Sequence, residues 1–245
     1  SSYIQYKRMG DALKQASSMW AKVTHSEEKP ITYSICEWGM ARPYLWGAKA
    51  GSMWRTTPDI APNWRSITMI YNRTLKLYKY SGPGHWNDPD MLEVGNGKLD
   101  DNENRAHFSL WCMLAAPLML GNDIRSFVSN GMPDKDNETL KIVTNKHMIA
   151  VDQDSLGKSA KRIKKESGID IIARPLSNGD VALCFFNTAS STKSVNFKLD
   201  DLAKDSYLGI EASPSGYELH DLWTDERTTG TTINATIPKH STVVY

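Results

Sequence analysis

The chain changes the periodicity of its apolar residues once, and this change limits the folds that it can adopt. Before the segment Asp152–Gly157, short apolar runs alternate with segments of helical spacing. After it, apolar residues recur at every second position, first over residues 169–173. The first pattern predicts an α/β unit and the second an antiparallel β unit. We therefore expect two domains, an α/β domain over residues 1–158 and an antiparallel β domain over residues 159–245.

Three apolar runs in the first domain contain or end in charged residues beside Trp, Gly or Pro. They span residues 31–39, 51–59 and 117–123. In a parallel α/β sheet the carboxyl ends of the strands meet at one edge, where sites are built. Helical spacing and capping residues predict four helices, over residues 6–21, 62–78, 100–114 and 137–150. The first of these is expected to cover the sheet with one apolar face, formed by Met9, Ala12, Leu13, Ala16 and Trp20.

The second domain is expected to contain only strands and turns. The Asn-Gly pair within residues 177–180 favours the tight turn of a β-hairpin. Alternating apolar residues predict strands around residues 169–173, 181–185, 195–199, 217–223, 231–237 and 241–245.

The segment Ser81–Asn96 crowds polar groups onto a constrained loop. Gly-Pro-Gly at 82–84 forces a turn, and the proline after Asp88 biases that residue away from helix. Charged groups on such a loop beside an aromatic residue indicate a ligand site. The alternative is a turn rich in Asp and Asn in which Trp86 and Met91 only fill the core.

Composition argues against two classes of partner. The 245 residues carry a formal net charge of +1, and no Lys/Arg cluster is interleaved with aromatics, so no nucleic-acid partner is expected. The basic run 161–165 is interpreted as a solvated face next to a loop. The longest apolar run, 110–120, contains Pro117 and is about half of the roughly 20 residues that a membrane span needs. No membrane partner is expected either.

Cysteines and glycosylation sequons give weaker indications. The three cysteines, Cys36, Cys112 and Cys184, lack metal-type spacing and are expected to be buried free thiols, although an odd count leaves a bond to a further cysteine open. The sequons favour a secreted or extracellular glycoprotein, with a lysosomal or vacuolar location left open; they begin at Asn72, Asn137 and Asn234.

Six residues are expected to share one pocket at the carboxyl ends of the strands: Glu37, Trp38, Arg55, Asp59, Asp90 and Met91. A sugar site needs a flat apolar surface for the ring and charged partners for the hydroxyls, and this set contains both. Glycoside cleavage also needs a carboxyl group that can donate a proton, and Asp59 is the candidate for that role.

Other chemistries fit the sequence less well. A divalent metal on Asp88 and Asp90 would lack a His ligand at a usable spacing, because His85 is isolated. No nucleophile elbow, dinucleotide fingerprint or P-loop is present. No metal and no cofactor are therefore expected.

Five motifs in register resemble those of the α-galactosidases of glycoside hydrolase family 27. They are Cys-Glu-Trp-Gly (36–39), Trp-Arg-Thr-Thr-x-Asp-Ile (54–60), Gly-Pro-Gly-x-Trp-Asn-Asp-Pro-Asp-Met (82–91), Ala-Ala-Pro-Leu (115–118) and Asn-Asp-Ile-Arg (122–125). The resemblance implies the C-terminal half of a (β/α)₈ TIM barrel, about strands 5–8, followed by an antiparallel β-sandwich domain. It also implies a retaining exo-glycosidase that removes terminal α-linked galactose from oligosaccharides or glycoconjugates.

The resemblance assigns roles to the pocket residues. Asp59 matches the general acid/base, Arg55 a sugar-contacting arginine and Glu37 the carboxylate that binds the galactose 2-hydroxyl, while Trp38, Asp90 and Met91 match further pocket residues. Relatives that cleave α-N-acetylgalactosamine have a small residue where Glu37 stands, so Glu37 favours galactose.

One part of the family pattern has no counterpart in this sequence. The family's nucleophile is an Asp at the end of the fourth barrel strand, which precedes the helix at residues 6–21. We therefore expect a C-terminal portion that carries the acid/base but not the nucleophile, and that is inactive and poorly stable when isolated. The alternatives are an α-N-acetylgalactosaminidase or β-L-arabinopyranosidase of the same family, or a non-catalytic galactose-binding protein. The sequence leaves the oligomeric state open.

Overall fold

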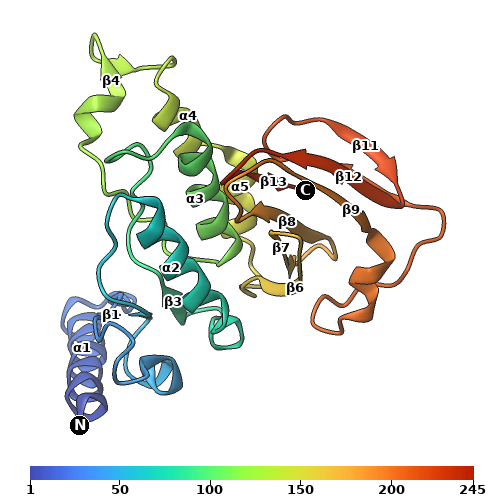
Figure 1. Ribbon diagram of the computed structural model, residues 1–245. Helices are drawn as coiled ribbons and strands as arrows, with labels where there is room; N and C mark the ends of the chain where they lie inside the picture. The colour runs from blue at the N-terminus through green and yellow to red at the C-terminus, as the bar shows by residue number, and fades with distance from the viewer.

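The computed structural model describes residues 1–245 and contains an α/β part followed by an antiparallel β part (Figure 1). In chain order the first part contains α1 (Ser2–Thr24), β1 (Ser34–Ile35), β2 (Met53–Arg55), α2 (Trp64–Leu75), β3 (Trp86–Asp88), α3 (Asp101–Met113), β4 (Val128–Ser129), β5 (Met132–Pro133), α4 (Glu138–Val143) and α5 (Lys146–Asp152). The second part contains β6 (Lys161–Glu166), β7 (Ile169–Pro175), β8 (Val181–Asn187), β9 (Lys193–Lys198), β10 (Tyr217–His220), β11 (Arg227–Gly230), β12 (Thr232–Ile237) and β13 (Thr242–Val244).

The α/β part is built on a parallel sheet in the order β1-β2-β3. Met53 of β2 pairs with Ser34 on one side and with Trp86 on the other. A parallel bridge between Leu92 and Leu120 continues the arrangement beyond β3. The three strands therefore end at the same edge. The predicted runs 31–39 and 51–59 contain β1 and β2, but the run 117–123 forms only the bridge at Leu120 and no strand.

Side-chain caps set where the predicted helices begin. At α3 the Asp100 side chain accepts from Glu103 N while the Glu103 side chain accepts from Asp100 N, which is a capping box. The single helix predicted over 137–150 is wrong, because the region forms α4 and α5 as separate helices. Asn145 causes the break: its side chain accepts from the backbone N–H groups of His147 and Met148 and so caps a new helix.

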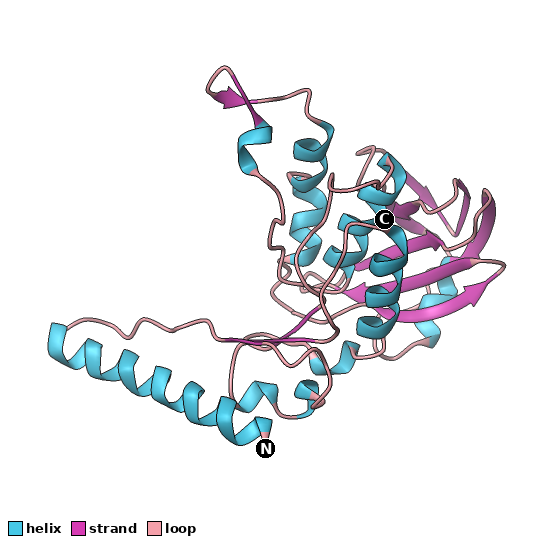
Figure 2. Cartoon of the chain, turned by 60° about the vertical axis from the view of Figure 1, so that its left-hand side comes forward, coloured by secondary structure: helices cyan, strands magenta, loops and turns pink.

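Helix α1 is where the sequence predicted a helix, but the predicted apolar face is wrong. Met9 and Trp20 are 51% and 41% exposed, whereas the buried residues are Gly10, Ser17 and Ala21. A Cβ added to Gly10 would lie 1.9 Å from a backbone carbonyl oxygen of the following segment, so the helix approaches its neighbour through small residues. Figure 2 shows α1 at one end of the molecule, away from the antiparallel strands. Apolar spacing identifies a helix but does not decide which face is covered.

The sheet β13-β8-β7-β6 lies between the helices and the strands β9 and β12 (Figure 1) and separates two hydrophobic cores. Ile172 and Phe186 face the core formed with α2, α3 and α5, while Ile171 and Phe185 face the core formed with β9 and β12. All seven residues of β7 are buried, on both faces of the sheet. The reason is that helices cover one face of the sheet and strands cover the other.

Three smaller predictions for this region are corrected by the structure. The basic run 161–165 lies in β6; Lys164 and Lys165 are exposed as predicted, but Lys161 and Arg162 are half-buried and paired with Asp205 and Asp170. The β10–β11 hairpin includes a strand, β11, that the sequence did not predict. Cys112 and Cys184 are buried free thiols as expected, but Cys36 is an exposed free thiol.

A buried carboxylate joins α2 to this sheet. Asp170 is fully buried; Arg162 donates to its two oxygens at 2.5 and 2.8 Å, and the Tyr71 hydroxyl donates at 2.7 Å. Burial, together with the neighbouring Asp170 charge, raises the pKa of Tyr71, which keeps its hydroxyl protonated as a donor. The Asp170 charge is thus matched by one cation and one hydrogen-bond donor from two elements.

We predict that Arg162→Ala lowers the free energy of unfolding by about 3–5 kcal/mol, because it leaves the Asp170 carboxylate buried without its cation. The matched control is Lys164→Ala on the same strand, whose pair with Glu166 has side chains that are 51% and 57% exposed. That change is expected to cost less than about 1 kcal/mol. Urea denaturation of the two variants measures the difference, and equal losses would contradict the assignment.

A second buried carboxyl group lies at the end of α5. Burial raises the pKa of Asp152 to about 7. A hydrogen bond from Gln153 and the nearby charge of Arg174 lower this pKa, but by less than burial raises it. A carboxyl that holds its proton more tightly in the folded chain than in the unfolded one stabilises the fold below pH ~4 and loses that contribution as the pH rises through about 7. The rise of the Asp152 pKa from 3.8 to about 7 corresponds to a change of at most about 4 kcal/mol in the free energy of unfolding.

We therefore predict that Asp152→Asn reduces the fall in Tm between pH 5 and pH 8, since the amide does not ionise. Thermal unfolding followed by circular dichroism at a series of pH values checks this. Asp136→Asn, a change at an exposed residue, is the control and is expected to leave the pH profile of the wild type unchanged.

Candidate active site

The carboxyl ends of β2 and β3 bring together charged residues that are distant in sequence. Arg55, the last residue of β2, is paired in register with Asp88, the last residue of β3. Asp59 follows on the loop to α2, and Asp90 follows β3 by two residues. Because the strands are parallel, both loops leave the sheet at the same edge, so Asp59 and Asp90 can both reach Arg55.

Arg55 contacts both carboxylates through one nitrogen. Its Nη2 lies 2.7 Å from Asp90 Oδ2 and 3.0 Å from Asp59 Oδ1, and it donates to the Thr57 carbonyl at 3.2 Å. The side chains of Arg55 and Asp90 are 11% and 10% exposed, whereas that of Asp59 is 69% exposed. The Arg55–Asp90 pair is therefore a fixed, buried element, and Asp59 extends from it into open space.

Backbone donors hold Asp90 in place. Its Oδ2 accepts from Ile60 N and its Oδ1 from Met91 N, both at 2.8 Å. Its own N–H donates to Asp88 Oδ1 at 2.8 Å, and burial raises the pKa of Asp88. The φ angle of Asp90 is 81°, a left-handed conformation that Asp tolerates better than most residues.

Trp111 of α3 supports this loop, and the sequence did not identify it. Its Nε1 donates to the Asp90 carbonyl at 2.8 Å, and the whole side chain is buried. The sequence predicted a helix over residues 100–114 without a role for Trp111, and the structure places its ring in the core. The signal that could have indicated its second role is the polar Nε1–H, which needs an acceptor when it is buried.

The remaining pocket candidates lie on neighbouring loops. Trp38 is 45% exposed with φ 50°, and a Cβ on Gly39 would lie 2.2 Å from the Thr56 carbonyl oxygen, so this turn packs against the residue that follows Arg55. Glu37 is half-buried in the same turn. Met91 is 42% exposed, and its Sδ would lie 2.7 Å from a Cβ on Gly121.

The structure thus brings Arg55, Asp59 and Asp90 into direct polar contact. Met91 joins this group only through its backbone N–H, which donates to Asp90, and Glu37 and Trp38 form no hydrogen bond or ion pair with it. Two anions around one cation, with one anion exposed, can bind hydroxyl groups and move a proton at Asp59.

We predict that Arg55→Met destabilises the fold by about 3 kcal/mol, because Asp90 then stays buried without a cation. Asp59→Asn is expected to cost less than about 1 kcal/mol, since its side chain is 69% exposed. Denaturant unfolding of both variants makes the comparison. A loss of equal size in the two would show that Asp90 does not depend on Arg55.

Comparison with known proteins matches both parts of the chain to one family. A family model described as "Alpha galactosidase A" matches residues 4–154, and one described as "Alpha galactosidase C-terminal beta sandwich domain" matches residues 166–245. The fold class predicted from the sequence, an α/β barrel portion followed by a β-sandwich, is thereby confirmed.

Individual relatives agree with this assignment. An α-galactosidase of Cyamopsis tetragonoloba is 36% identical over 249 residues, which cover 99% of this chain and 57% of the relative. An α-galactosidase A of Cellvibrio japonicus is 36% identical over 251 residues, covering 94% of this chain and 59% of the relative. The chain therefore spans little more than half the length of these relatives.

Solved structures show the same likeness. The crystal structure of α-galactosidase I from Mortierella vinacea superposes with a TM-score of 0.84 at 28% identity, covering 99% of this chain and 62% of that one. An α-galactosidase from Saccharomyces cerevisiae solved with raffinose superposes with a TM-score of 0.78 at 25% identity, covering 100% of this chain and 67% of that one. By its family models and its relatives, the chain belongs to the α-galactosidases of glycoside hydrolase family 27.

Proposed function

We propose that the chain carries the acid/base part of a retaining exo-α-galactosidase that removes terminal α-linked galactose. One observation carries this proposal: the Arg55 guanidinium contacts both carboxylates. Its Nη2 lies 3.0 Å from Asp59 Oδ1, and the buried Asp90, whose Oδ2 lies 2.7 Å from the same nitrogen, fixes the guanidinium in place. A general acid/base needs a positioned carboxyl that substrate can reach, and the exposed Asp59 side chain meets both requirements. The barrel portion that bears it is assigned to residues 1–158.

In the proposed reaction Asp59 first protonates the leaving glycosidic oxygen while a second carboxylate attacks the anomeric carbon. After the leaving group departs, a water molecule attacks the anomeric carbon of the glycosyl–enzyme while Asp59 takes its proton. The bond from this carbon to the second carboxylate then breaks, and galactose is released. Arg55 keeps Asp59 in one orientation during both steps, because the guanidinium is itself held by Asp90.

The nearby carboxyl groups are poor candidates for the nucleophile. Both oxygens of Asp90 accept backbone N–H groups, and one also pairs with Arg55, so neither is free to attack. Asp88 Oδ1 accepts from Asp90 N at 2.8 Å, so this oxygen is already engaged in holding the loop. We therefore propose that the nucleophile is an Asp outside these 245 residues, on a strand that would lie beside β1.

Glu37 supports galactose as the sugar. Its carboxylate can accept from a 2-hydroxyl group, and its side chain fills the space that a 2-acetamido group would need. A β-L-arabinopyranoside lacks only the hydroxymethyl group and remains the nearest alternative substrate. A structure of a family 27 β-L-arabinopyranosidase from Geobacillus stearothermophilus shares the fold, with a TM-score of 0.73 at 22% identity.

We propose a secreted or vacuolar location on the basis of the sequons. No helix in the structure is long and apolar enough to cross a membrane. Among the sequon asparagines, Asn72 uses its side-chain amide nitrogen to donate to the Thr68 carbonyl at 2.8 Å. Asn72 is therefore a poorer site for glycan attachment than the exposed Asn234.

The test is the release of p-nitrophenol from aryl glycosides by this chain and, in parallel, by the product of the longer coding sequence. The substrates are the α-galactoside, the α-N-acetylgalactosaminide and the β-L-arabinopyranoside. We expect hydrolysis of the α-galactoside by the longer protein only. Activity in both proteins would overturn the nucleophile assignment, and activity in neither would favour a galactose-binding protein.

In the active protein, Asp59→Asn is predicted to reduce turnover of an α-galactoside with a poor leaving group by about 10²–10⁴-fold, because the general acid is lost. For a substrate with an activated phenol as leaving group, the rate of the glycosylation step is expected to fall less, because such a phenol leaves without protonation. Asp136→Asn, which removes an exposed carboxylate on the loop before α4, is the matched control. Retained turnover of the poor substrate by a folded Asp59→Asn protein would remove Asp59 from this role.

A further inference from the structure

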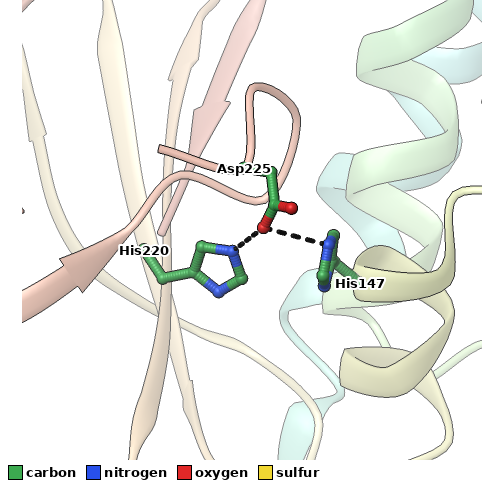
Figure 3. Close-up of side chains that lie close together, drawn as sticks. All are labelled: His147, His220 and Asp225. Atoms are coloured by element: carbon green, nitrogen blue, oxygen red, sulfur yellow. Dashed lines mark hydrogen bonds and ion pairs between the residues drawn. The ribbon is translucent and has the colours of Figure 1, made fainter. Parts of the chain in front are cut away.

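Three potential metal ligands converge where the α/β part meets the antiparallel part (Figure 3). His147 lies on α5, His220 ends β10, and Asp225 lies on the turn between β10 and β11. The Nε2 atoms of His147 and His220 are 3.2 and 2.6 Å from the same oxygen, Asp225 Oδ1. The ligand atoms of all three residues lie within 4.8 Å of one another.

This geometry suits a small divalent cation that prefers nitrogen ligands. Ligands at about 2.0–2.1 Å from a tetrahedral Zn²⁺ are roughly 3.3 Å apart. The two separations from Asp225 Oδ1, 2.6 and 3.2 Å, are close to this value, and the imidazole nitrogens, which lie within 4.8 Å of each other, can approach it by ring rotation. Two imidazoles and one carboxylate are an established type of zinc ligand set. Mg²⁺ and Ca²⁺ prefer oxygen ligands and are poorly matched to this set.

The surroundings leave one side of the cluster accessible. The side chains of His147 and His220 are 28% and 19% exposed, while that of Asp225 is 63% exposed. Both histidines also line a cavity of about 890 Å³ between α5 and the antiparallel strands. A cation held by the three side chains could therefore keep water as a fourth ligand.

The turn that presents Asp225 is already in place. Asp225 has φ 64°, and its N–H donates to the Asp221 carbonyl at 2.9 Å. The Asp221 side chain in turn accepts from Trp223 N at 2.9 Å and from Thr224 N at 3.0 Å. Ligand binding therefore requires little ordering of the backbone.

One neighbouring cation opposes metal binding. Arg227 Nη2 lies 3.4 Å from His220 Nδ1. Coordination through Nε2 places the imidazole proton on Nδ1, where it would face the guanidinium. Arg227 can turn towards Glu218, to which its Nη1 already donates at 2.5 Å.

We propose that His147, His220 and Asp225 form a binding site for Zn²⁺ that links α5 to the β10–β11 hairpin. The site is independent of the catalytic residues. Because two of its ligands come from the antiparallel part and one from the α/β part, the bound ion joins the two parts and stabilises their contact.

The experiment is isothermal titration of the purified, metal-free protein with Zn²⁺, with Mg²⁺ as the comparison cation. We expect one Zn²⁺ bound per chain, no binding of Mg²⁺, and a Tm that rises with Zn²⁺ concentration. His147→Gln and Asp225→Asn are each expected to weaken Zn²⁺ binding by more than about tenfold. Circular dichroism without metal verifies that both variants fold.

Two further variants sharpen the test. His25→Asn changes an exposed histidine whose φ of 52° Asn also tolerates, so Zn²⁺ affinity is expected to stay the same. Arg227→Gln removes the opposing cation and is expected to strengthen binding. Absence of Zn²⁺ binding, or binding that is unchanged in folded His147→Gln and Asp225→Asn proteins, would overturn the proposal.

Discussion

The structure depends on one sheet that is buried on both faces. Strands β7 and β8 separate the core formed with the helices from the core formed with β9 and β12, so each core needs the sheet to exclude water. Double burial makes a polar group in these strands costly unless it has a partner inside the protein, and among the polar side chains of β7 and β8 only the Nε and Nη2 atoms of Arg174 lack one. Asp170 receives Arg162 and Tyr71, and Arg174 donates to the Cys112 carbonyl at 2.8 Å. These contacts fix α2 and α3 against the sheet.

The same packing positions the candidate active site. Helix α3 packs against β7, β8 and β13 on one side, and on the other its Trp111 donates to the Asp90 carbonyl. Asp90 holds Arg55, and Arg55 holds Asp59. The exposed carboxylate is thus connected to the most buried sheet through a short series of contacts, each with little rotational freedom. A carboxylate in open solvent can keep a defined orientation in this way.

Much of this arrangement could be predicted from the sequence. Local signals were sufficient for α3, whose capping box and apolar run are continuous, and for the hairpin around Asn178 and Gly179. They failed where distant residues decide the outcome, and at one local cap inside a helical pattern. The covered face of α1 depends on the close approach of Gly10 to its neighbour, and the break at Asn145 depends on a cap within an otherwise helical pattern. The contact of Trp111 with Asp90 and the His147–His220–Asp225 cluster join distant segments, so neither had a spacing signal.

The division of roles between Asp59 and Asp90 follows from their solvent exposure. Arg55 is shared by both, but Asp90 is 10% exposed and satisfied by two backbone donors, while Asp59 is 69% exposed with one oxygen held. A carboxylate with all its contacts made by protein gains little from a substrate and serves as a support. A carboxylate with an open oxygen can exchange protons with whatever enters the site. The three charged side chains at this sheet edge therefore form an ordered group in which Asp59 alone keeps an oxygen without a protein partner.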